Sequence, residues 1–310
     1  MAATTRWKDN TITDIDQAIV ELTDDVERDE KQTGIIWDNW RFTRMFENNQ
    51  KIELNSKIIE YNYIKYSFNQ TTVGEFLVED RSVLREGFII VYKSESGVNY
   101  IINQNTTAQR ILRKILSYAG KNELEKHSFE FSNDFFIWLI YRVYNATYNI
   151  EMTVDNKELH LDSIKGFKGD TQDLQTKVSA EGETVINVIS TLSFLLESNN
   201  LNQIKLELEY TGHSNISMVL QKGTVNLCLN EYDGSLEQEE EASRIAKLYL
   251  ITYLEILPSL ATEYYSDIEN DLWNTEIYIK FMEDVAQTLT KQVDAKINAF
   301  RNEKYYKIFQ

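Results

Sequence analysis

The residues from 203 to 229 alternate between apolar and polar side chains in a way that constrains the fold strongly. The apolar positions recur at every second residue within three runs, Ile204, Leu206, Leu208 and Tyr210, then Ile216, Met218 and Leu220, then Val225, Leu227 and Leu229. Successive side chains of a β-strand point to opposite faces, so this period predicts strands with one apolar face. Thr211-Gly212 and Lys222-Gly223 separate the runs as turns. The segment therefore predicts an antiparallel meander whose apolar face is covered by a helix.

The alternation stops at Asp233-Gly234, and the chain that follows has a helical pattern. We predict helices over about 236–256 and 260–271, with the first ending near Pro258, because a proline disfavours helical geometry at the residue before it. A long final helix carries apolar residues at spacings of 3, 4, 4, 4 and 3, namely Met282, Val285, Leu289, Val293, Ile297 and Phe300.

The part of the chain before residue 203 mixes both patterns. We predict helices at 13–28, 106–119, 135–144 and 183–198, strands at 57–68, 148–154 and 157–164, and a hairpin at 87–103. Ser132 or Asp134 could cap the helix at 135–144. The expected class is α+β, with antiparallel strands, packed buried helices and a helical C-terminal portion. We expect an N-terminal α+β portion over 1–126, a central helix and meander over 127–234, and a helical portion over 235–310.

Composition limits the setting in which the protein works. The net charge is 32 − 49 = −17, the chain has one cysteine and one proline, and its first residues have no apolar segment of the signal-peptide type. One cysteine excludes an internal disulfide and is consistent with a reducing compartment. We therefore expect a cytoplasmic protein with no membrane association, and the scarcity of proline, glycine and alanine favours a prokaryotic or phage source.

The residue types that most often carry catalysis form no recognisable motif. His127, His160 and His213 are far apart and show no zinc-ligand spacing. No nucleophile elbow of the G-x-S-x-G type is present, and Gly166 to Thr171 lacks the order of a phosphate-binding loop. Cys228 has no evident electropositive neighbours. We expect no cofactor and no metal, and the balance favours a protein that is not an enzyme.

One acidic and basic pair offers an enzymatic alternative. Asp155 and Lys157, which follow the predicted strand at 148–154, resemble the D-x-K end of restriction-type nuclease cores. In such cores carboxylates hold Mg²⁺ and the lysine stabilises charge. A second carboxylate, such as Glu151, would be required. The other interpretation is a plain turn between two short strands.

A basic helix edge offers a second alternative, nucleic-acid binding. Arg110, Arg113 and Lys114 are three and four residues apart, so they share one face of the helix predicted at 106–119. Such an edge can contact phosphates, although the net charge of −17 opposes nucleic acid. The same acidity allows a third function class, a decoy that occupies the nucleic-acid groove of a basic partner.

Aromatic and apolar positions support the leading hypothesis, an interaction protein. Trp37 and Trp40 could anchor a protein partner. The stripe of the final helix, including Val285, Leu289, Val293 and Ile297, must be buried against this chain or another one. We expect a non-enzymatic regulatory protein that forms homo-oligomers through its C-terminal helices. Its composition suggests an accessory role in a conflict between bacterium and phage.

Overall fold

A computed structural model describes most of the chain and divides it into two compact units. The described residues are 3–24, 30–32, 34–75, 77–152, 156–171, 177–181, 196 and 198–302. Unit 1 consists of Met1–Phe129, Gly223–Leu229 and Ser235–Leu257. Unit 2 consists of Glu130–Lys222, Asn230–Gly234 and Pro258–Gln310. Antiparallel sheets, packed helices and a helical C-terminal portion confirm the α+β class. The three-part division at residues 126 and 234 stays a prediction.

Unit 1 is built on an eight-stranded antiparallel sheet. Its strand order is β2-β3-β5-β6-β7-β1-β8, and β4 pairs with β5. The strands are β1 Thr5–Asp9, β2 Glu30–Gln32, β3 Ile35–Arg44, β4 Gln50–Leu54, β5 Lys57–Thr72, β6 Ser82–Ser94, β7 Gly97–Ile102 and β8 Leu124–Lys126. The hairpin of β6 and β7 confirms the one predicted at 87–103.

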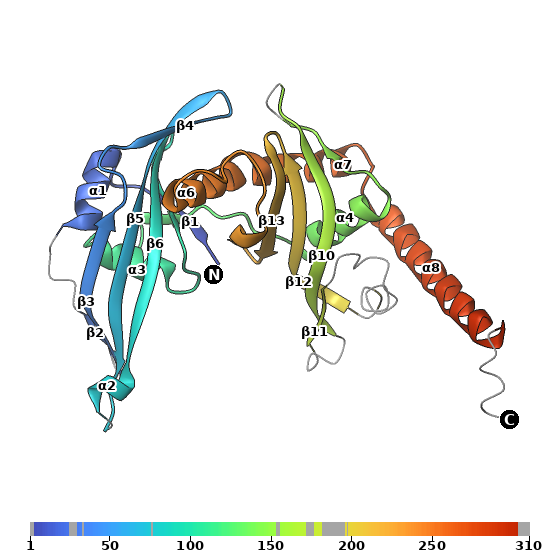
Figure 1. Ribbon diagram of the computed structural model, residues 1–310, viewed down its shortest axis with the longest axis horizontal. Coiled ribbons are helices and arrows are strands. Elements are labelled where there is room, and N and C mark those ends of the chain that lie inside the picture. Colours follow the sequence, from blue (N-terminus) through green and yellow to red (C-terminus); the bar gives the residue numbers. More distant parts are fainter. Residues whose placement is uncertain are drawn as a thin grey trace. The chain divides into compact units, whose positions relative to one another are not determined.

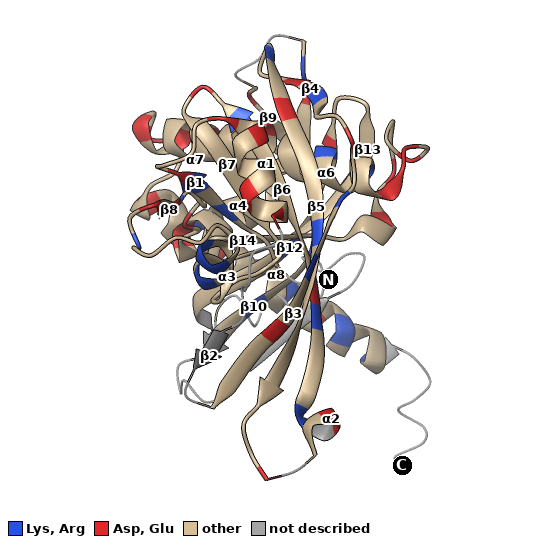
Figure 2. Ribbon diagram, turned by 90° about the vertical axis from the view of Figure 1, so that its left-hand side faces the viewer, with Lys and Arg blue, Asp and Glu red and all other residues tan. Residues whose placement is uncertain are grey.

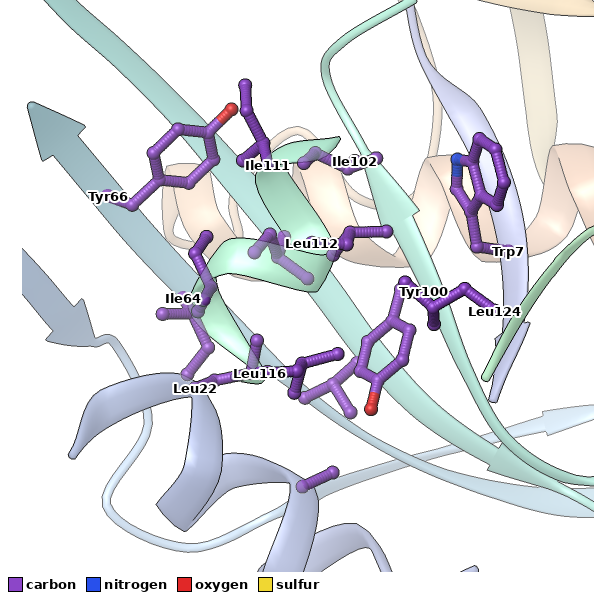
Figure 3. Close-up of a cluster of buried hydrophobic side chains, with 14 of the residues drawn as sticks. Trp7, Leu22, Ile64, Tyr66, Tyr100, Ile102, Ile111, Leu112, Leu116 and Leu124 are labelled. Atoms are coloured by element: carbon purple, nitrogen blue, oxygen red, sulfur yellow. The ribbon is translucent and has the colours of Figure 1, made fainter. Parts of the chain in front are cut away.

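Helices cover both faces of this sheet (Figure 1). On one face, α1 (Ile15–Thr23) and α3 (Ala108–Ile115) bury the even-numbered side chains of β5 in one apolar cluster, among them Ile64 and Tyr66 (Figure 3). On the other face lies α6 (Glu241–Ile251), where the ring centroids of Phe88 and Tyr249 are 5.7 Å apart. The short helix α2 (Val78–Arg81) connects β5 to β6. Strand β5 is therefore buried on two sides, which accounts for its run of Ile and Tyr residues.

A buried carboxylate, that of Asp9, ties the end of β1 to the apolar cluster. Its Oδ1 accepts hydrogen bonds from the backbone N–H groups of Thr11 and Ile12, each at 2.8 Å. Its Oδ2 accepts from the hydroxyls of Tyr100 and Tyr118, each at 2.7 Å. With four donors the 3 % exposed Asp9 is well satisfied, as a buried charge must be.

The helix that begins at Glu241 does not end near Pro258, so that prediction was wrong. It continues through the π-helical segment η3 (Thr252–Ile256) into α7 (Leu257–Glu269). Proline has no N–H to donate to the carbonyl four residues earlier, that of Leu254. The side-chain amide of Asn55 donates to that carbonyl instead, at 2.7 Å. The backbone N–H of Asn55 donates to buried Glu255, also at 2.7 Å, so the β4–β5 turn compensates for the proline.

The same helical run meets a simple length and composition test for a membrane span. It covers 29 residues, Glu241–Glu269, and contains a window with a mean hydropathy of 1.2. Of that window, 72 % is buried within the protein. Such burial is the property of a core helix, and core helices meet the same test.

Unit 2 contains the predicted alternation as long strands of one antiparallel sheet. The order is β11-β10-β12-β13, with β9 paired to β10. The strands are β9 Asn149–Ile150, β10 Leu159–Thr171, β11 Lys177–Glu181, β12 Ser198–Tyr210 and β13 His213–Gln221. The third predicted run forms β14 (Thr224–Leu227) in unit 1, followed by the short helix η2 (Leu229–Glu231). The helix predicted at 183–198 lies almost entirely outside the described residues.

Helix α4 (Asn133–Tyr144) packs on β10 and β12, and a polar network joins it to α7. Asp267 accepts a hydrogen bond from the indole N–H of Trp138 at 2.8 Å and pairs with Arg142 at 3.0 Å. Arg142 also pairs with Glu263 at 3.0 Å. Of the two possible caps, Ser132 and Asp134, it is Ser132 that caps α4, accepting from the N–H of Phe135 at 3.0 Å. These bonds fix the position of α4 against α7 within unit 2.

The buried tyrosines of unit 1 predict alkaline unfolding. Burial raises the pKa of Tyr249 to about 12, and burial also raises the pKa of Tyr92. A tyrosine in the unfolded chain has a pKa of about 10, so it loses its proton at a lower pH than the buried tyrosine does. Well below pH 10 both states are protonated, and this group does not change the free energy of unfolding with pH. That free energy falls as the pH rises through 10, by about 1 kcal/mol for Tyr249 between pH 10 and 11. Urea denaturation at pH 8, 10 and 11, monitored by circular dichroism, measures the free energy of unfolding at each pH, and tyrosinate absorbance reports the ionisation of tyrosine.

A matched pair of variants separates this effect from other alkaline titrations. We expect Tyr249→Phe to reduce the loss of stability between pH 10 and 11, whereas Tyr265→Phe, at a 61 % exposed position, leaves it unchanged. Equal slopes for the two variants would contradict the assignment to buried tyrosine.

Candidate functional site

The long final helix, α8 (Thr275–Asn302), is anchored to unit 2 through its first half. Asn274 caps the helix, because its Oδ1 accepts from the N–H groups of Glu276 and Ile277 at 3.0 Å each. The ring of Phe281 packs against Tyr144 of α4, with centroids 5.4 Å apart. The hydroxyls of Tyr144 and Thr288 are 2.7 Å apart. Beyond this contact the helix extends away from the sheet and from α4 (Figure 1).

The apolar stripe predicted on α8 is divided between two environments. Val285 is fully buried within unit 2, so this predicted partner residue belongs to the core. Leu289 is half-buried, whereas Val293 is 40 % and Ile297 is 43 % exposed. Phe300, one turn further, is 63 % exposed. The second half of the stripe has no cover within the described chain.

A second apolar row runs along α8 beside the buried one. Its members follow the 3-4-3-4 spacing of a coiled-coil heptad over Ile279, Met282, Ala286, Leu289 and Val293, and the row continues through Ile297 and Phe300. We call this row the outer seam. Phe281 and Val285 lie on an adjacent face of the helix and are buried, and Phe281 packs against Tyr144 of α4. The single stripe predicted from the sequence contains residues of both rows, because Val285 belongs to the buried row and the others to the outer seam. Ile279 and Ala286, which the prediction left out, also belong to the outer seam.

The charges of α8 are distributed unevenly along its length. The first half carries Glu276, Lys280, Glu283 and Asp284, a net charge of 1 − 3 = −2. The second half carries Lys291, Asp294, Lys296 and Arg301, a net charge of 3 − 1 = +2. Two such helices attract each other when they pair antiparallel and repel when they pair in parallel.

The predicted basic residues Arg110, Arg113 and Lys114 lie on α3, a helix on which Figure 2 shows basic positions in blue. The guanidinium of Arg110 lies 3.8 Å from the ring centroid of Trp37, a cation–π contact. Arg113 donates to the carbonyl of Ala119 at 2.7 Å and so closes the end of the helix. Both arginines thus have structural roles within unit 1, and phosphate binding stays a prediction.

The two predicted tryptophan anchors lie in or against the core. Trp37 is 3 % exposed, so its ring is covered by unit 1 rather than presented to a partner. Trp40 is half-buried and stacks on Phe68, with ring centroids 4.2 Å apart. The sequence could not distinguish this cluster from an exposed one, because both are rich in aromatic residues.

The nuclease alternative cannot be assembled from the described residues. Asp155 lies outside them, and Lys157 extends over the ring of Tyr210, with 5.7 Å between its Nζ and the ring centroid. Within the described chain no three His, Cys, Asp or Glu side chains come together as a metal site. His160 and His213 instead contact Asn149 and Tyr232, each at 2.6 Å.

Comparison with models of known protein families and with curated proteins found no match to this chain. Beyond the half-buried Leu289, the described fold leaves the predicted apolar residues Val293, Ile297 and Phe300 of α8 exposed.

The contact between Arg110 and Trp37 predicts a loss of stability on truncation. We expect Arg110→Ala to lower the free energy of unfolding by about 1 kcal/mol, because the stacked guanidinium covers a buried ring. Lys121→Ala, at a nearby exposed position, is expected to change it by less than about 0.5 kcal/mol. Urea denaturation followed by tryptophan fluorescence measures both. Equal effects would show that the stacking contributes nothing specific.

Proposed function

We propose that this protein is a cytoplasmic, non-enzymatic interaction protein that self-associates through the outer seam of α8. One observation carries the proposal. The seam continues for three turns beyond the last contact with α4, and its exposed fraction rises from 40 % at Val293 to 63 % at Phe300. Apolar rows of this kind, on a helix that extends into solvent, are normally buried by association.

A second copy of the chain fits the seam better than an unrelated partner. Heptad spacing favours another helix with the same spacing, which an identical chain supplies. In an antiparallel pair the acidic half around Glu283 faces the basic half around Lys296, so the charges are complementary. The interface would be isologous and closed, as in most homodimers. Nothing in this arrangement requires a cofactor.

The other expected functions have weaker support. Arg110 and Arg113 are engaged within unit 1, which leaves less of the basic edge for nucleic acid. The decoy hypothesis rests on the net charge of −17 alone. The proposed place in a bacterium–phage conflict rests on composition.

Charge introduced into the seam is expected to give a monomer. We predict that the wild type sediments as a dimer in analytical ultracentrifugation at micromolar concentrations. The double variant Val293→Glu and Ile297→Glu places carboxylates at the centre of the interface. We therefore expect the dissociation constant of the dimer to rise at least about tenfold. Both positions are exposed, at 40 % and 43 %, so the fold should be retained.

A matched control guards against a general effect of added charge. Ile58→Glu replaces an apolar residue that is 69 % exposed but lies on β5 in unit 1. We expect this variant to remain dimeric with an unchanged far-ultraviolet spectrum. A monomeric wild type, or a dimeric seam variant, would rule out the proposal.

The orientation of the two helices is tested by a charge exchange. Glu283→Lys is expected to weaken the dimer about two- to fivefold, and adding Lys296→Glu is expected to restore it, because the two positions face each other across an antiparallel pair. In a parallel pair they are separated by about 20 Å along the helix axis and cannot compensate. Sedimentation at low salt measures the difference, and two additive losses would indicate parallel pairing.

A further inference from the structure

Unit 2 contains a cavity of about 360 Å³ beside the first turn of α8. Two of its apolar lining residues, Ile137 of α4 and Trp273, are buried. Two more are partly exposed, namely Ile268 of α7, at 39 %, and the half-buried Tyr278 of α8. An apolar recess of this kind can receive a large side chain of a protein partner.

The cavity lies at the beginning of the outer seam. Thr275, which lines the cavity, is four residues before Ile279 and continues the seam by one turn. In a pair of helices with heptad spacing, a side chain of one helix enters a hole formed by four residues of the other. The first such hole on α8 is formed by Thr275, Tyr278, Ile279 and Met282. Because Thr275 and Tyr278 also line the cavity, this hole leads into it.

The seam is complementary to itself in the antiparallel direction. Three pairs of seam residues are equally distant from a centre beside Leu289, namely Ile279 and Phe300, Met282 and Ile297, and Ala286 and Val293. In an antiparallel pair of identical helices, the two residues of each such pair face each other across the interface. The partner's Phe300 therefore lies against Ile279, at the hole that leads into the cavity.

Phe300 cannot occupy the cavity of its own chain. It lies 22 residues after Tyr278 on one continuous helix and is exposed. At 1.5 Å per residue the two positions are about 33 Å apart. Figure 1 shows this helix extending away from α4 and α7, which line the cavity. A second copy of the chain is needed to bring this ring to the cavity.

The charges around the cavity favour the same occupant. Asp134 lines the cavity, Glu276 lies in the first turn of α8, and both are exposed. No lysine or arginine is among the described residues that line the cavity. The exposed Arg301 follows Phe300, so in the antiparallel pair it comes to the level of Glu276. An apolar anchor with opposite charges beside it is typical of specific interfaces.

We propose that the ring of Phe300 from a second copy of the chain packs in this cavity, against Ile137, Ile268 and Tyr278. The inference rests on the proposed self-association through the outer seam, and it extends that interface from α8 to α4 and α7. Because the pair is isologous, the contact forms twice in each dimer. Each copy thus completes an apolar cluster of the other.

Cross-linking between two differently substituted chains tests the contact directly. Both chains carry Cys228→Ser, which removes the one natural cysteine, and one carries Phe300→Cys while the other carries Ile268→Cys. We expect a short bismaleimide to give a covalent dimer from the mixture and none from either variant alone. The variants alone do not react, because the two copies of position 300 are about 30 Å apart along an antiparallel pair. A covalent dimer from Phe300→Cys alone would indicate parallel pairing and overturn the proposal.

Charge substitutions on α7 separate the cavity from the seam. Ile268→Asp places a carboxylate in the cavity and leaves the seam unchanged, so we expect the dissociation constant of the dimer to rise at least about tenfold. Phe300→Ala should raise it by at least as much. The matched control Tyr265→Asp places the same charge on an exposed residue of α7 that does not line the cavity. It should change the dissociation constant less than about twofold.

Analytical ultracentrifugation of the full chain measures these constants, and circular dichroism verifies that each variant is folded. A monomeric wild type would overturn both this proposal and the seam pairing on which it rests. A second result would overturn the cavity contact alone, a dimer that Val293→Glu with Ile297→Glu dissociates but that Ile268→Asp does not weaken. Equal weakening by Ile268→Asp and Tyr265→Asp, or no covalent dimer from the mixed chains, would also overturn the cavity contact.

Discussion

Burial of the β5–β6 hairpin on both faces is the constraint on which unit 1 depends. The even-numbered side chains of β5, such as Ile64, pack under α1 and α3, while the odd-numbered Tyr61 and Tyr63 lie on the opposite face, where α6 packs. A strand covered on two sides cannot slip by one residue without exchanging its faces. The Asp9 network and the contact between Arg110 and Trp37 then secure the elements around this hairpin.

Unit 2 uses one helix for two purposes. The side of α8 that carries Phe281 and Val285 completes the core beside α4, while the outer seam remains available. Anchoring by Asn274 and Phe281 therefore fixes the direction in which the outer seam extends.

Patterns that repeat locally were predictable, and features assembled from distant segments were not. The alternation from Ile204 to Tyr210 predicted β12 because its period is set by the backbone itself. The continuation of the helix through Pro258 depends on Asn55, about two hundred positions earlier, and no local rule reveals it. Trp37 carries no signal that distinguishes a buried ring from an exposed one. The hydrogen bond from Trp273 to Asp134 likewise joins residues that only the folded chain brings together.

The discontinuity of unit 1 has a consequence for its synthesis. Its sheet is complete once Phe129 has been translated, but α6, which covers the face bearing Phe88, begins only at Glu241. At about 5–20 residues per second the ribosome needs on the order of ten seconds to make the segment between them. During that interval the face of the nascent sheet that bears Phe88 has no α6 to cover it.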